Sequence, residues 1–144
     1  MDVLSITILL FCLMELANVI ILYFKPNSKL GNSMSVFKNY KEAKKDKTLN
    51  LFVHYLVYWV AGVKLIFILL LLVILFVGNQ VTKVGALITM IFSVTTYYWK
   101  LHPLIKKLDK MNKITPKGYS KTLGLMIGII LMVFILSLII YYFK

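Results

Sequence analysis

Residues 12–20, CLMELANVI, place a glutamate and an asparagine within a segment that is otherwise apolar. Glu15 and Asn18 are three residues apart, and Cys12 precedes Glu15 by the same interval, so in a helix these side chains share one face. An ionised carboxylate at the centre of a bilayer costs at least ~2.5 kcal/mol, and such groups either pair with another charge or belong to an ion or proton pathway. This polar face therefore predicts either cation or proton binding, or a structural ion pair.

Lys64, in WVAGVKLIF, is the second charge inside an apolar segment and the candidate partner of Glu15. Glu15 lies nine residues before Phe24, and Lys64 lies thirteen residues after Leu51. If Phe24 and Leu51 lie at the same membrane interface, the two backbones differ in depth by ~6 Å, which a long lysine side chain can span. We therefore expect either an ion pair between antiparallel helices or a polar pathway that uses both residues.

The composition places these charges in a membrane protein. Of the 144 residues, 60% are hydrophobic and 15% are charged, and the mean hydropathy is +0.86. A soluble domain would have about a quarter of its residues charged. The 17 basic residues are all lysines, and most of them lie in two loops between apolar segments. Because this distribution is typical of membrane topology, no nucleic-acid partner is expected.

We expect an all-α integral membrane protein with four transmembrane helices, because about 20 apolar residues cross a hydrocarbon core. Within a single membrane domain of residues 1–144, the predicted spans are approximately 3–24, 51–77, 84–99 and 122–143. The third has the shortest apolar run and is diluted by threonines and a serine. The N-terminal run lacks the basic start and the small-residue cleavage site of a signal peptide, so we expect it to remain as a span.

The two connections 25–50 and 100–121 contain seven lysines each. By the positive-inside bias both lie in the cytoplasm, which leaves both termini outside a multi-pass protein of the cell membrane. In the second loop, apolar residues from Leu101 to Met111 recur at helical spacing among lysines and predict a short amphipathic helix at the interface. In the first loop, KPNSKLGNS predicts turns and VFKNYKEAKKDK a short helix. Anionic lipids at the cytoplasmic face are expected partners, at about 1 kcal/mol for each lysine near the surface. For most of the lysines we expect a role in topology alone, with the side chains solvated.

Small residues repeat every fourth position in the third and fourth predicted spans, a pattern that lets helix backbones approach closely. They are Gly85, Thr89 and Ser93, and Ser120, Gly124 and Gly128. We expect helix association on these faces, either between the third and fourth spans or with a second copy of the chain. Because so short a chain has little interior of its own, a homo-oligomer or a larger membrane complex is also expected.

An enzymatic role is not expected. His54, Tyr58 and His102 lie near the loop ends of their spans and are interpreted as interfacial residues. The sequence contains no HExxH motif, no GxSxG elbow and no glycine-rich phosphate loop, so no metal or cofactor is predicted. Cys12 is the only cysteine, which excludes an intrachain disulfide.

Two functional hypotheses remain. The first is a small transporter or channel whose pathway runs along Glu15, Asn18, Lys64 and Cys12. The second is a non-transporting accessory or immunity-type membrane protein, in which Glu15 and Lys64 form a structural ion pair. The sequence modestly favours the first, because polar residues occur on more than one span.

Overall fold

The computed structural model describes residues 2–28 and 34–143, so part of the predicted turn segment KPNSKLGNS lies outside the described residues. Three helices are long and apolar enough to cross a membrane: α1 (Val3–Phe24), α3 (Lys47–Val77) and α6 (Tyr119–Phe143). They correspond to three of the four predicted spans. Helix α3 begins before the predicted residue 51 because Asp46 caps it, accepting hydrogen bonds from the backbone N–H groups of Thr48 at 2.8 Å and Leu49 at 3.1 Å.

The third predicted span, 84–99, is not one continuous α-helix in the structure. Helix α4 (Gln80–Thr96) starts earlier, where the Asn79 side chain accepts from the Thr82 N–H at 2.9 Å. It then continues through a π-helical turn, η2 (Tyr97–Leu101), into α5 (His102–Lys110). With 17 residues and several hydroxyl side chains, α4 is shorter and less apolar than the three candidate spans. Three candidate spans are therefore present in the described chain, and a bundle of four spans is not established.

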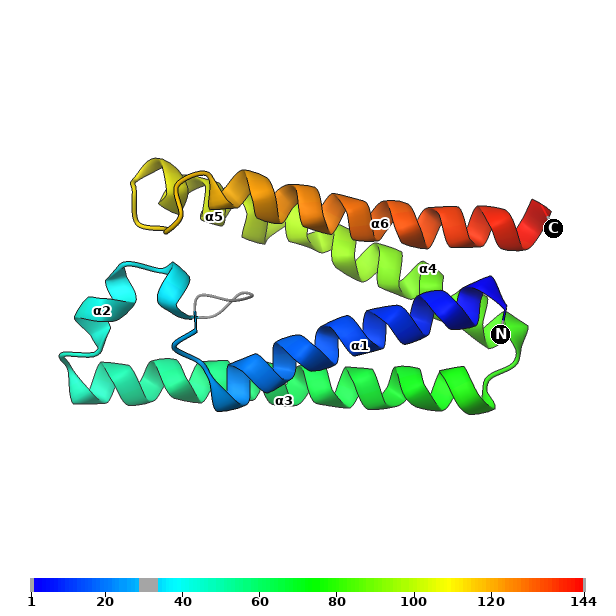
Figure 1. The fold of residues 1–144 in the computed structure, drawn as a ribbon, viewed down its shortest axis with the longest axis horizontal. Helices are drawn as coiled ribbons and strands as arrows, with labels where there is room; N and C mark the ends of the chain where they lie inside the picture. The colour runs from blue at the N-terminus through cyan, green and yellow to red at the C-terminus, as the bar shows by residue number, and fades with distance from the viewer. Residues whose placement is uncertain (1, 29–33, 144) are drawn as a thin grey trace.

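The long helices form two antiparallel pairs. Helix α1 lies beside α3, and α6 lies beside the rod made by α4 and α5 (Figure 1). Contacts of α1 with both α6 and α4 join the two pairs. Both chain ends lie at one end of the molecule, and both lysine-rich loops lie at the other (Figure 1).

The main core lies where the four helices meet. The ring of Phe11 on α1 packs edge-on against Phe134 on α6, with 5.2 Å between the ring centroids. Next to it, the hydroxyl groups of Thr7 and Ser137 are hydrogen-bonded at 2.6 Å, which satisfies two buried polar groups across the same interface. The other buried side chains of this core are Leu4, Ile8, Cys12, Val19, Leu22, Ala61, Ile68, Leu71, Leu75, Leu87 and Met90.

The two lysine-rich loops contact each other. The first contains η1 (Met34–Val36) and α2 (Asn39–Ala43), which is shorter than the helix predicted there. Phe37 forms an isolated antiparallel bridge with Ile114. The Lys38 N–H donates to the Lys113 carbonyl at 2.9 Å, and the Thr115 N–H donates to the Val36 carbonyl at 2.9 Å.

This contact changes the expected role of the amphipathic helix. Ile105 on α5 is buried, and it packs in one cluster with Val36, Ile114 and Leu123. Leu101, Leu104 and Met111 remain exposed. The helix thus forms as predicted, but part of its apolar face packs against the protein, and it is a direct continuation of η2 and α4.

Candidate functional site

The ion pair expected from matched membrane depth is present between α1 and α3. Lys64 Nζ donates hydrogen bonds to Glu15 Oε2 at 2.7 Å and to Asn18 Oδ1 at 3.1 Å. One ammonium group therefore contacts two polar residues of the opposite helix. The arrangement neutralises the carboxylate and uses the asparagine oxygen as a second acceptor for the lysine.

Glu15 and Lys64 occupy positions in the interface along which α1 and α3 pack. Each is flanked by buried apolar residues three or four positions away, the spacing that places residues on one helix face. These flanking residues are Phe11 and Val19 on α1, and Ala61 and Ile68 on α3. The ion pair thus takes the place of an apolar contact within a continuous packed interface.

The remaining polar residue of this face is enclosed. Cys12 is 2% exposed and belongs to the apolar core. The side chains of Glu15 and Lys64 are 20% and 31% exposed, so the pair is covered on most sides. A cavity of about 220 Å³ between α1 and α6 has apolar walls that include Leu10, Met14 and Val133, and it is not lined by Glu15, Asn18 or Lys64.

His54 and Tyr58 lie in an aromatic cluster at the loop end of α3. His54 Nδ1 donates to the Asn50 carbonyl at 2.8 Å, and the His54 ring packs against Tyr58 with centroids 5.9 Å apart. The ring of Tyr40 on α2 also lies near His54, with centroids 6.3 Å apart, and Tyr23 of α1 stacks on Tyr58, with centroids 5.8 Å apart. These contacts join α1, α2 and α3 at the end that carries the lysines.

Gly124 and Gly128 permit the close packing that their spacing predicted. A Cβ atom at Gly124 would lie 2.9 Å from His102 Cε1, and one at Gly128 would lie 3.2 Å from the Tyr98 hydroxyl oxygen. The Tyr98 hydroxyl donates to the Gly124 carbonyl at 2.6 Å, and the Tyr97 hydroxyl lies 3.2 Å from His102 Nδ1. His102 and Tyr98 thus fill space that the glycines leave on α6.

The small-residue face of α4 is not packed within this chain. Gly85, Thr89 and Ser93 are exposed, and no atom lies within 4 Å of a Cβ built on Gly85. The Thr89 hydroxyl donates to the Gly85 carbonyl of its own helix at 2.8 Å. Helix α4 instead packs through the larger side chains of Leu87 and Met90.

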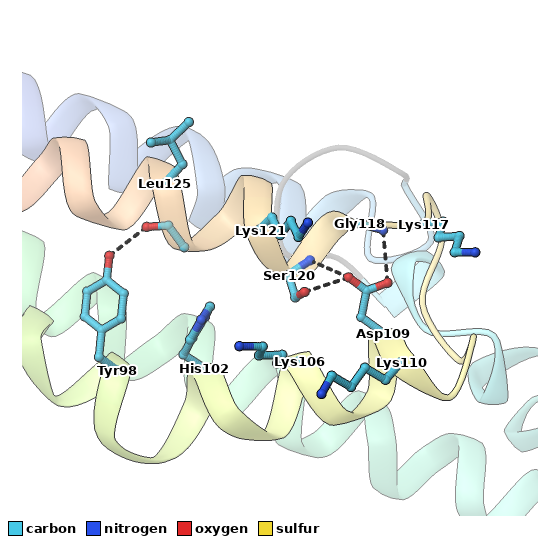
Figure 2. Close-up of a pocket in the computed structure, with 11 residues that line it drawn as sticks. Tyr98, His102, Lys106, Asp109, Lys110, Lys117, Gly118, Ser120, Lys121 and Leu125 are labelled. Carbon is cyan, nitrogen blue, oxygen red and sulfur yellow. Dashed lines mark hydrogen bonds between the residues drawn. The ribbon is translucent and has the colours of Figure 1, made fainter.

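A cavity of about 590 Å³ lies at the loop end, between the η2–α5 segment and α6 (Figure 2). The sequence pattern does not predict this cavity, because its walls come from segments that meet only in the fold. Lysines line it on both sides, and Tyr98, Gly124 and Leu125 line the part nearest the spans. The lysines are Lys106, Lys110, Lys117 and Lys121.

Asp109 lies in the wall of this cavity and caps α6 (Figure 2). Its carboxylate accepts from the backbone N–H groups of Gly118 and Ser120, each at 3.0 Å, and from the Ser120 hydroxyl at 2.6 Å. These hydrogen bonds, led by that from the Ser120 side chain, hold the pKa of Asp109 below its ordinary value. Ser120, predicted as a packing residue, therefore also binds Asp109.

A smaller polar cluster joins α1 and α4 at the opposite end. Asp2 caps α1 by accepting from the Ser5 N–H at 2.9 Å, and Lys83 Nζ lies 3.8 Å from the same carboxylate. Lys83 also donates to the Ser5 hydroxyl at 2.8 Å, and Gln80 donates to Asp2 at 3.2 Å. Partial burial alone would raise the pKa of Asp2, but hydrogen bonds from Ser5 and Gln80 hold it well below its usual range.

Within residues 2–28 and 34–143, no three His, Cys, Asp or Glu side chains are grouped so that they could hold a metal ion. No protein-family model matches the chain, and neither does any curated protein or solved structure.

Proposed function

We propose that the chain is a non-transporting accessory or immunity-type membrane protein, which acts through contacts with other polypeptides and in which Glu15 and Lys64 form a structural ion pair. The observation that carries this proposal is the position of the pair. Both residues lie within the packed α1–α3 interface and bond to each other across it. A charge pair in an otherwise apolar helix interface can fix the register of the two helices.

One exposed face of the molecule also favours a role in contact with partners. The small-residue face of α4, at Gly85, Thr89 and Ser93, is left open by the chain's own helices. Such faces support close approach of another helix in a membrane. We propose that this face contacts a second copy of the chain or a partner subunit.

A transporter or channel is the second candidate. It is favoured by the partial exposure of the pair, 31% for the Lys64 side chain and 20% for that of Glu15. In this alternative Glu15 exchanges Lys64 for a proton or a cation during each transport cycle. Lys64 would then have to leave both of its acceptors, Glu15 and Asn18.

For the topology, we propose that both lysine-rich loops are cytoplasmic and both termini are extracytoplasmic. The gathering of both loops at one end of the molecule supports this orientation (Figure 1). Lys41→Cys and Lys110→Cys, each in a Cys12→Ser background, should resist an impermeant thiol reagent added to intact cells, whereas Asn79→Cys should react. Ready labelling at positions 41 and 110 would reverse the assignment.

Ion flux separates the two functional candidates. Liposomes that contain the purified protein should be no more permeable to protons, K⁺ or Na⁺ than liposomes without it, and Glu15→Gln should change nothing. Flux that depends on Glu15 would support the pathway and contradict the present proposal. Purification in mild detergent should in turn retain a second polypeptide, either another copy or a different chain.

A further inference from the structure

Among the described residues, the lysines that line the cavity between α5 and α6 form no ion pair within 4 Å. In the described part of the chain, the ion pairs within 4 Å are Lys64 with Glu15 and Lys83 with Asp2. Lys106, Lys110, Lys117 and Lys121 therefore place four positive charges around one concave site. Its wall contains a single carboxylate, that of Asp109, which interacts electrostatically with Lys117. Such an arrangement is suited to an anion supplied from outside the chain.

The one carboxylate in the cavity wall, that of Asp109, already accepts hydrogen bonds from the chain itself. Asp109 accepts three hydrogen bonds from Gly118 and Ser120, and these satisfy N–H groups at the start of α6. The helix terminus is thus not available to an incoming anion. An anion in the cavity would instead be held by the lysine ammonium groups.

The cavity also has an apolar end. Tyr98 and Gly124 form its wall on the side of the spans, and Leu125, which is 67% exposed, lies beside them on α6 (Figure 2). The lysines follow toward the turn that joins α5 and α6 (Figure 2). The lining therefore changes from apolar to cationic in the direction that leads from the candidate span to the loop.

We propose that this cavity binds a phosphate group, and that its source is the head group of an anionic phospholipid. The lysines contact the phosphate, and the first acyl carbons lie beside Leu125 on the surface of α6. A volume of about 590 Å³ is within the range of pockets that hold small ligands. Free inorganic phosphate offers the same anionic oxygens to the lysines, but it has no apolar group that could contact the apolar end of the cavity.

The test is native mass spectrometry of the detergent-purified protein with added phosphatidylglycerol or phosphatidylcholine. The wild type should retain phosphatidylglycerol in preference to phosphatidylcholine. Lys106→Gln with Lys121→Gln should weaken phosphatidylglycerol binding about thirtyfold, since lysines near a lipid surface contribute about 1 kcal/mol each. Both substituted side chains are exposed, and a thermal melt confirms that the variant is folded.

Lys41→Gln with Lys45→Gln is the matched control, because it removes the same charge from exposed lysines outside the cavity. Binding should be unchanged in this variant. Equal losses in the two double variants, or no loss in either, would overturn the proposed site. Millimolar inorganic phosphate distinguishes a phospholipid from free phosphate as the ligand. If phosphate fails to displace the lipid, the phospholipid is supported. Displacement that depends on Lys106 and Lys121 supports the phosphate site but overturns the lipid as its source.

Discussion

Lys64 Nζ lies 2.7 Å from Glu15 Oε2, across the interface of two antiparallel helices in which the neighbouring positions are apolar. The same ammonium group also reaches Asn18, one helical turn further along α1. Because both acceptors must lie within reach of one lysine, sliding α1 along α3 would break these hydrogen bonds. The contact therefore favours one register of the two helices, in a medium where apolar side chains alone provide little discrimination.

The glycines of α6 should be sensitive to substitution. Gly124→Leu must displace His102, whose ring lies where the new side chain would start, and we expect it to destabilise the protein by ~1–3 kcal/mol through overpacking. Met132→Leu is the control, because Met132 is an exposed residue of the same helix and lies outside the packed face. Thermal unfolding in detergent should show a lower Tm for the first variant alone. Equal effects at the two positions would contradict the packing described for α6.

The contact between the two loops should contribute to stability. Ile114 is 2% exposed and packs with Val36, Ile105 and Leu123, so Ile114→Ala should cost ~2–4 kcal/mol by leaving a cavity. Met111→Ala, in the same loop but at an exposed position, should change stability little. Chemical unfolding of both variants is the measurement. If the Ile114→Ala protein is as stable as the Met111→Ala protein, packing between the two loops does not stabilise the fold.

Asp109 should stabilise the start of α6 in a pH-dependent manner. Asp109→Ala removes the cap provided to Gly118 and Ser120, and at neutral pH we expect a loss of ~1 kcal/mol. Because folding lowers the pKa of Asp109, its contribution is present above the ordinary carboxyl pKa and is lost as the pH falls through the lowered value.

The wild type and Asp109→Ala should therefore differ in Tm at pH 7 and converge in strongly acidic solution. Glu42→Gln, which alters an exposed carboxylate, controls for net charge. A difference in Tm that is constant with pH would assign the effect of Asp109 to something other than its charge.

The ion pair and three of the predicted helices could be inferred from the sequence because both follow from the energetics of apolar media. A charge within an apolar run needs a partner, and Lys64 is the charge at matching depth in the neighbouring segment. The choice of packed faces could not be inferred in the same way. Lipid-facing and buried positions are equally apolar, so nothing in the local pattern separates Gly85, which is open, from Gly124, which is packed.

The contact of Phe37 with Ile114 and the basic cavity depend on residues that are distant in the sequence. Each loop alone predicts turns, a short helix and the membrane topology, but no contact with the other loop. Asp109 and Ser120 hold α5 against α6, and in this arrangement the same lysines line one cavity.

The stability of Glu15→Gln, Lys64→Met and the double variant tests the structural role of the ion pair most directly. If the pair is structural, each single substitution leaves an unpaired polar or charged group between α1 and α3 and lowers stability by ~3 kcal/mol, and the double variant recovers most of that loss. Thermal unfolding in one detergent gives all three values. A Glu15→Gln protein as stable as the wild type, or losses that simply add in the double variant, would contradict a structural ion pair.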